Sequence, residues 1–265
     1  MNEGPPHSTW LDRWENRPPT DDDHPGCHPE EWFERWPLYA QKFLDRHHRP
    51  MVAVSYAQSV DGSIATHHRR QILLSGRESM LLTHRVRAAC DAIVIGINTL
   101  IADDPQLTVR LVEGTSPQPV VLDSNLRIPL RARLLDRSDR HCWLACTDRK
   151  DPNLVGAVEG RGAQVIRCRR NRQDRVDLPN LLHLLGRKGI RSIMVEGGSQ
   201  VITSFIKSRL VDQMIITIAP RLVGGLPVLD RPAADDGSLL HLHSVSTQSC
   251  GPDIVLWARP QWQDP

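Results

Sequence analysis

Apolar and polar positions follow two regular patterns along most of the chain. From residue 50 onward, short apolar runs predict buried strands over residues 51–56, 92–97, 119–122, 141–146, 164–168, 190–195 and 213–219. Stretches with helical spacing lie between them, over 75–89, 152–160, 178–188 and 201–210. Two last apolar stretches, 239–247 and 254–259, predict an antiparallel C-terminal hairpin. This order predicts an α/β fold with a mostly parallel central sheet and helices on both faces.

Capping and turn residues mark where some of these elements should begin and end. The sequence Ser75-Gly76-Arg77-Glu78 matches the S-x-x-E capping box and predicts that a helix starts there. Asp177 stands where its side chain would cap the next-to-last predicted helix. A loop is expected over 58–62, in which Asp61 and Gly62 form the turn after the first strand.

The first 49 residues differ in character from the rest. They contain four of the seven tryptophans, at positions 10, 14, 32 and 36, together with many prolines and an acidic run over 21–23. This composition predicts an irregular N-terminal extension over 1–49 with one helix over about 29–46, followed by one domain over 50–265. Because indole rings need an apolar surface, these tryptophans are expected to pack against the body or a partner subunit.

The overall composition argues against several classes of function. The chain has 265 residues, a 40% hydrophobic fraction and a net charge of +2, so a globular protein without affinity for nucleic acid or a membrane surface is expected. No apolar run is long enough to cross a bilayer, and the N-terminus lacks the apolar core of a signal peptide. A cytoplasmic protein is therefore expected. The arginine-rich stretch 167–175 is expected to be a solvated loop.

Cysteines and histidines do not predict a metal site. The six cysteines include no C-x-x-C pair, which argues against zinc and against a disulfide framework. Cys142 and Cys146 are expected on one face of a strand, as small buried thiols. The histidine pairs at 47–48 and 67–68 are adjacent in the chain, so their side chains point to different sides. No bound metal is expected.

The segment Glu196-Gly197-Gly198-Ser199 is the strongest candidate for a ligand-binding turn, because an apolar run ends there and an amphipathic stretch begins. Glycines let the backbone approach a ligand closely. The free N–H groups and the positive dipole end of the following helix suit a phosphate, and Glu196 suits a hydroxyl or amide of a second ligand. The pattern is not G-x-G-x-x-G, so it does not support a standard Rossmann domain. A tightly packed turn without any ligand is the alternative.

Several segments, in a fixed order, resemble one enzyme family. They are residues 57–65, 74–76, 84–88, 91–110, 121–124, 195–199, 210–212 and 218–225. Together they resemble the reductase domain of riboflavin biosynthesis, over residues 50–259. The zinc signature of the deaminase half, H-x-E with P-C-x-x-C, is absent from the sequence, so a standalone reductase is expected.

The resemblance implies a dihydrofolate-reductase-like fold and a homodimer. It also implies an NADPH-dependent enzyme that reduces the ribosyl group of 5-amino-6-(5-phosphoribosylamino)uracil to a ribityl chain. By this resemblance the cofactor-binding residues are Ala57, Thr99, Asp103, Ser124, Gly197, Gly198, Ser199, Gln200, Val201, Ile202, Thr203 and Ser204. The substrate-binding residues are Arg70, Arg87, Leu107, Arg110 and Glu196, the arginine forks being suited to a sugar phosphate. The catalytic residues are Asp103 and Glu196.

Some of these residues have simpler interpretations. Thr99 could cap a helix, and Asp103 could bond the backbone of its own turn. Arg87 could be an ordinary exposed helix residue, and Glu196 a salt-bridged carboxylate. For the 2′-phosphate that distinguishes NADPH from NADH, the candidates by charge alone are Arg149, Lys150 and Arg169.

The sequence also departs from the family pattern. Arg70 stands where the family usually has a small hydroxyl residue, and Ser55 or Tyr56 stands where it often has a lysine on the first strand. These departures keep two alternatives open. One is a reductase of the same fold that uses NAD(P)H on another pyrimidine or pteridine-like metabolite. The other is a non-catalytic, nucleotide-binding relative.

Overall fold

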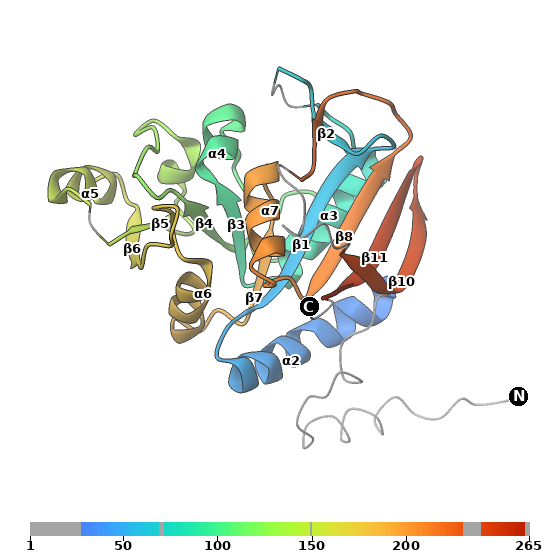
Figure 1. Ribbon diagram of the computed structural model, residues 1–265, viewed down its shortest axis with the longest axis horizontal. Coiled ribbons are helices and arrows are strands. Elements are labelled where there is room, and N and C mark those ends of the chain that lie inside the picture. Colours follow the sequence, from blue (N-terminus) through green and yellow to red (C-terminus); the bar gives the residue numbers. More distant parts are fainter. Residues whose placement is uncertain (1–27, 69–71, 149, 230–239, 263–265) are drawn as a thin grey trace, which may run out of the picture.

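A nine-stranded sheet runs through the molecule, with helices on both of its faces (Figure 1). The computed structural model describes residues 28–68, 72–148, 150–229 and 240–262. The strands of this sheet are β1 Met51–Ser59, β3 Ala92–Gly96, β4 Gln118–Leu122, β5 Trp143–Thr147, β6 Gln164–Cys168, β7 Ser192–Val195, β8 Gln213–Ala219, β10 His241–Cys250 and β11 Asp253–Gln261. Their order is β10-β11-β8-β1-β7-β3-β4-β5-β6. The strands from β8 to β6 run parallel, and β11 and β10 add an antiparallel hairpin. The expected α/β architecture, a mostly parallel central sheet with helices and an antiparallel C-terminal hairpin, is confirmed.

Helices cover the sheet in three packed clusters. The helices are α2 Pro29–His47, α3 Arg77–Ala89, α4 Ile97–Asp103, α5 Pro152–Glu159, α6 Leu178–Arg187 and α7 Ser199–Lys207. Along β1, Val52 and Val54 pack under α6 and α7, while Met51 and Ala53 pack under α2 and α3. This alternation follows the two-residue period of a strand. On β3 to β5, the second face is covered by α4, α5 and a short helical turn, Arg133–Asp136.

Helix α2 confirms that the N-terminal segment packs against the body. Trp32 and Trp36 are both 0% exposed, and their rings stack with centroids 4.3 Å apart. Trp32 also meets Trp257 of β11 at 5.4 Å. The helix therefore completes the core on the α3 side of the sheet. The two other tryptophans of the segment, at positions 10 and 14, lie outside the described residues.

Helix starts show where local pattern suffices and where it does not. The Asp177 side chain accepts a hydrogen bond from Asn180 N, so the predicted cap of α6 is confirmed. The capping box at residue 75 is wrong, because α3 starts at Arg77 with Gly76 as its N-cap and without a local side-chain cap. Instead, a carboxylate from the far end of the chain, that of Asp253 on β11, accepts from Gly76 N at 2.7 Å.

The loop expected over 58–62 is shorter than predicted, because β1 pairs with β8 as far as Ser59. A second, two-stranded sheet follows, formed by β2 Ser63–Ala65 and β9 Leu226–Pro227, and the apolar pattern did not predict it. We call this small sheet the flap.

Some general expectations can be compared with the described residues. Cys142 and Cys146 are buried in the same cluster, as predicted. Within the described ranges, no helix combines the length and the apolar character that a membrane crossing requires. In those ranges too, no three His, Cys, Asp or Glu side chains gather as a metal site would require.

Candidate active site

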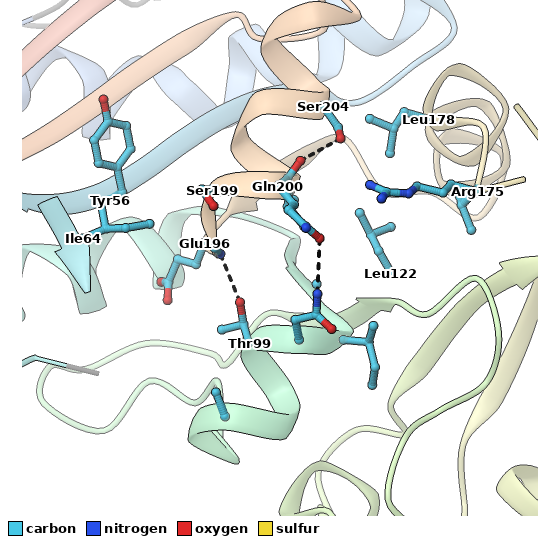
Figure 2. Close-up of a pocket in the computed structure, with 18 of the residues that line it drawn as sticks. Tyr56, Ile64, Thr99, Leu122, Arg175, Leu178, Glu196, Ser199, Gln200 and Ser204 are labelled. Carbon is cyan, nitrogen blue, oxygen red and sulfur yellow. Dashed lines mark hydrogen bonds between the residues drawn. The ribbon is translucent and has the colours of Figure 1, made fainter. Parts of the chain in front are cut away.

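A cavity of about 1560 Å³ opens at the carboxyl ends of the parallel strands (Figure 2). Residues at or near the carboxyl ends of β1, β3, β4 and β7 line it, among them Gly96, Ser124 and Glu196. Ligands of open α/β sheets bind at this edge. A single small molecule fills about 300–1,000 Å³, so this cavity has room for two ligands side by side.

The first turn of α7 forms one wall of the cavity. Ser199 and Gln200 line it, and no described residue accepts a hydrogen bond from their backbone N–H groups. Gly96 allows α7 to lie this close to β3, because a Cβ on Gly96 would be 2.6 Å from Val201 Cγ2. The wall therefore offers free amide donors at the positive end of a helix, as an anion site requires.

Thr99 holds the glycine turn rather than capping a helix. The N-cap of α4 is Gly96, so the capping interpretation of Thr99 is wrong. Its Oγ1 accepts a hydrogen bond from Gly198 N at 3.0 Å, shown as a dashed line in Figure 2. That amide is therefore not available to a ligand, although the resemblance assigned it to the cofactor. A second dashed line joins Asn98 to Gln200 across the same wall.

The stretch assigned to the cofactor is only partly exposed to the cavity. Ser199, Gln200, Val201 and Ser204 line it, as do Ala57, Thr99, Asp103 and Ser124. Ile202 and Thr203 face away, and both are buried. The helix period explains this division, because only one side of α7 faces the cavity.

Basic side chains surround the end of the cavity beyond α7. Arg170, Arg172 and Arg175 line it, and Figure 2 shows Arg175 extending toward Gln200 and Ser204. The solvated-loop prediction for this stretch is therefore incomplete, because exposed arginines also form a wall. Lys150 lines the cavity as well, with its Nζ 2.8 Å from Asn125 Oδ1.

Arg149 and Arg169 are the other two candidates by charge for a contact with the 2′-phosphate. Arg169 is not among the lining residues, and Arg149 lies outside the described residues. Sequence reasoning missed Arg175 because a run of charges does not show which of its members folds inward.

Arg87 and Glu196 meet at the other end of the cavity. Arg87 Nε donates to Glu196 Oε1 and Nη2 donates to Oε2, both at 2.7 Å. The side chains are only 10% and 18% exposed. Burial alone would lower the pKa of Arg87, but the charge and hydrogen bonds of Glu196 raise it above its usual value. The guanidinium fork expected for a sugar phosphate is thus occupied by a carboxylate.

Two predicted substrate residues, Leu107 and Arg110, do not line the cavity. Leu107 is buried in the α4–α5 cluster. Arg110 is exposed, and its backbone N–H donates to Nδ1 of the fully buried His84 at 3.1 Å. Burial, together with the charges of Arg87 and Arg110, lowers the pKa of His84 to about 4. The remaining predicted residue, Arg70, lies outside the described residues.

Two further titratable groups line the cavity in apolar surroundings. Asp103 has no hydrogen-bond partner among the described residues, and burial raises the pKa of its carboxyl. Burial raises the pKa of Tyr56 to about 12, so its phenol stays neutral in the physiological range. Tyr56, Ile64 and Glu196 are drawn at one end of the cavity in Figure 2, and Arg175 at the other.

The flap adds a wall that the sequence did not predict. Ile64 and Ala65 of β2 and Leu226 and Pro227 of β9 line the cavity. Asp61 was expected only to form a turn. Its carboxylate also accepts hydrogen bonds from the backbone of the segment that precedes β9, and so connects that segment to the turn that precedes β2.

Comparisons relate the chain to known proteins. The family model described as the RibD C-terminal domain matches residues 50–256. A protein of Archaeoglobus fulgidus named 2,5-diamino-6-ribosylamino-4(3H)-pyrimidinone 5′-phosphate reductase is 39% identical over 199 residues, which are 71% of this chain and 87% of that protein. Riboflavin biosynthesis protein RibD of Aquifex aeolicus is 31% identical over 212 residues, 79% of this chain and 57% of that protein, so the chain spans little more than half of it. The solved structure of Acinetobacter baumannii RibD superposes with a TM-score of 0.73 at 23% identity, covering 84% of this chain and 62% of that one.

Proposed function

Because the chain belongs to the RibD C-terminal domain family, we propose that it is an NADPH-dependent reductase of riboflavin biosynthesis. It would convert the ribosyl group of a phosphoribosylaminopyrimidine to a ribityl chain. The name of the Archaeoglobus fulgidus relative supports the reaction class. The observation that carries the proposal is one cavity in which the free N-terminus of α7 lies between Glu196 at one end and Arg175 at the other.

The residues along the α7 wall and beyond it toward Arg175 fit a nicotinamide dinucleotide. Free amides of Ser199 and Gln200 would hold its diphosphate, and Thr99 would keep the glycine turn in place through Gly198. Arg175 and Lys150 would meet a 2′-phosphate, which favours NADPH over NADH. When bound, the reduced nicotinamide supplies a hydride.

The Glu196 end would hold the pyrimidine and its sugar. Glu196 accepts hydrogen bonds only, so it suits N–H or O–H groups of the substrate, and Arg87 keeps its carboxylate oriented. The Asp103 side chain has no such partner in the described residues, and burial raises the pKa of its carboxyl, so we propose it as the group that exchanges a proton with the substrate. Two carboxyl groups in unlike surroundings are a usual arrangement for acid and base roles.

The pyrimidine could carry either of two groups. The resemblance implies the uracil form, 5-amino-6-(5-phosphoribosylamino)uracil, whereas the Archaeoglobus fulgidus relative is named for the diamino form. The resemblance assigns Arg110 to the sugar phosphate of either form; Arg110 is exposed outside the cavity lining, so this contact would need the phosphate to extend beyond the cavity.

The direct test uses the purified full chain with each pyrimidine phosphate and with NADPH or NADH. We expect loss of reduced nicotinamide absorbance only when a pyrimidine is present, and a product heavier by two hydrogens. The preferred pyrimidine distinguishes the two forms. No turnover with either pyrimidine and either nucleotide would overturn the proposal and leave a binding protein as the better interpretation.

The nucleotide preference has its own test. Arg175→Ala should raise the KM for NADPH by about tenfold, the effect of losing one charged contact, with little change for NADH. Arg169→Ala is the matched control, because Arg169 belongs to the same loop but is not among the residues that line the cavity. Equal effects on NADPH and NADH would refute a 2′-phosphate role for Arg175.

Two features of organisation are also proposed, the first on the resemblance and the second on the composition of the first 49 residues. The chain would form a homodimer, and the antiparallel strand β10 offers a sheet edge with a half-exposed Val245 for that purpose. Sedimentation of the full chain measures this directly. The division into an extension, 1–49, and a reductase domain, 50–265, is the second.

A further inference from the structure

The carboxylate of Asp61 joins two segments that are far apart in the sequence. It accepts hydrogen bonds from the hydroxyls of Ser59 and Ser63, on either side of its own turn. It also accepts from the backbone N–H groups of Val223 at 3.0 Å and Gly224 at 2.7 Å. Each carboxylate oxygen therefore accepts from one hydroxyl of the β1–β2 turn and from one amide of the segment that precedes β9.

The backbones of the two segments touch beside this carboxylate. Gly225 N donates to Ser63 Oγ at 2.8 Å. A Cβ on Gly225 would be 1.9 Å from the carbonyl oxygen of Ala65, so only glycine fits there without movement. Gly224 has φ +60°, the left-handed region that glycine adopts freely. This close approach brings β2 and β9 into the register of the flap.

Two backbone hydrogen bonds also join these segments, from Val60 N to Arg221 O at 2.9 Å and from Val228 N to Gly62 O at 3.2 Å, but the flap has no core of its own. Its two strands are three and two residues long, and an isolated two-stranded sheet is at best marginally stable. Apolar side chains beside it are open to water, with Leu222 80% exposed and Val60 60% exposed. Order in such a region depends on its polar contacts rather than on a core.

Flap residues face the end of the cavity where the substrate would lie. Ile64 and Leu226 line that cavity together with Tyr56 and Glu196. Figure 2 shows Ile64 at the Glu196 end, away from Arg175. A displaced flap would therefore widen the substrate end and leave the α7 wall unchanged.

We propose that Asp61 is a positioning residue, which fixes the flap as the wall against which the pyrimidine substrate is held. Asp61 touches neither reacting group and acts through Ile64 and Leu226. The assignment of the substrate end rests on the proposed function. The hydrogen bonds from Ser59, Val223 and Gly224 hold the pKa of Asp61 well below its usual range, so the ionised carboxylate accepts them. We call this carboxylate, with its bonds to Ser59, Ser63, Val223 and Gly224, the clamp.

Asp61→Asn is the sharpest variant, because it keeps the size of the side chain. In either orientation of the amide, its NH₂ group faces a backbone N–H, that of Val223 or Gly224, which cannot accept a hydrogen bond. We expect the KM for the pyrimidine to rise by about tenfold, the effect of about one charged hydrogen bond, with the Kd for NADPH unchanged. Hydrogen exchange of the β2 and β9 amides should become faster.

Asp212→Asn is the matched control. Asp212 also joins distant segments, through Arg49 and the backbone N–H of Val52, but is not among the residues that line the cavity. It should lower the melting temperature without changing flap exchange or the KM. If Asp61→Asn does not fold, Ser63→Ala removes one clamp bond and the bond to Gly225 N with a smaller change, and the same readouts apply.

The outcomes separate the two proposals. A wild-type KM and wild-type exchange in Asp61→Asn would overturn the clamp, and so would equal losses of pyrimidine and NADPH binding. An inactive wild-type protein would overturn the proposed function instead. Flap exchange would then still decide whether Asp61 fixes β2 to β9.

Discussion

Glu196→Gln should destabilise the folded protein by about 1.5–3 kcal/mol, because it removes one of the two hydrogen bonds between Arg87 and Glu196 and leaves the guanidinium without its counter-charge. Both bonds are 2.7 Å long, and the side chains are 10% and 18% exposed, so solvent replaces little of the loss. Complete removal of one partner of a buried pair costs about 3–5 kcal/mol, which sets the upper limit. Turnover should fall as well, whereas NADPH binding should stay near normal.

A double-mutant cycle with Arg87→Gln measures this interaction directly. The losses of stability in the two single variants should add up to more than the loss in the double variant. The difference, which is the coupling free energy, should be about 1–3 kcal/mol. Urea unfolding followed by circular dichroism gives the four values, and NADPH titration provides the functional control. Additive losses, with a coupling below about 0.5 kcal/mol, would refute the ion pair. Loss of NADPH binding in Glu196→Gln would refute the assignment of this carboxylate to the substrate end.

Three further predictions concern the core, a buried histidine and the flap. Trp32→Ala should destabilise the protein by about 3–5 kcal/mol and lower the melting temperature by about 6–20 °C, and a loss under about 1 kcal/mol would mean that α2 is not packed as described. Burial lowers the pKa of His84 in the folded protein to about 4, below the value of about 6.5 in the unfolded chain. The contribution of neutral His84 to the free energy of unfolding is therefore complete above about pH 6.5 and is lost as the pH falls toward 4. His84→Gln should flatten that slope in urea titrations across this range, and an unchanged slope would assign it to another group. Gly225→Ala should speed hydrogen exchange in the flap and raise the KM for the pyrimidine. Gly156→Ala is the control, because a Cβ there meets nothing within 4 Å, and it should stabilise α5 by about 0.5–1 kcal/mol. Equal effects of the two variants on flap exchange and on the KM would contradict the tight approach at Gly225.

The regular part of the fold could be predicted because it depends on short patterns. Strands β6 and β8 have the predicted limits, and the Asp177 cap of α6 needs only residues three positions apart. Apolar runs bounded by polar residues report burial directly, which is why the positions of these strands along the chain followed from them, whereas their order within the sheet did not.

Contacts between distant segments could not be predicted in this way. The start of α3 depends on Asp253, which lies 177 residues from Gly76, and no local pattern contains that information. The flap depends on Asp61 meeting amides about 160 residues away, and a two-residue strand such as β9 has no measurable period.

The candidate site was predicted residue by residue but not as an arrangement. Family resemblance identified Arg87 and Glu196 separately, as ligands of one substrate, yet they bind each other. It also identified Ile202 within the cofactor stretch, although the helix period turns this side chain into the core. A resemblance transfers positions along the chain, whereas charge pairing and helix rotation depend on three-dimensional neighbours.

Helix α2 precedes the segment that the family model matches, which begins at residue 50. A protein trimmed to that segment would lose α2 and would expose Met51, Val255 and Trp257, which pack in the same cluster as this helix. An exposed hydrophobic patch of this kind promotes self-association. Shortened versions for crystallisation or fusion should accordingly retain the chain from residue 28, since the limit of a family in sequence is here not a limit of the folding unit.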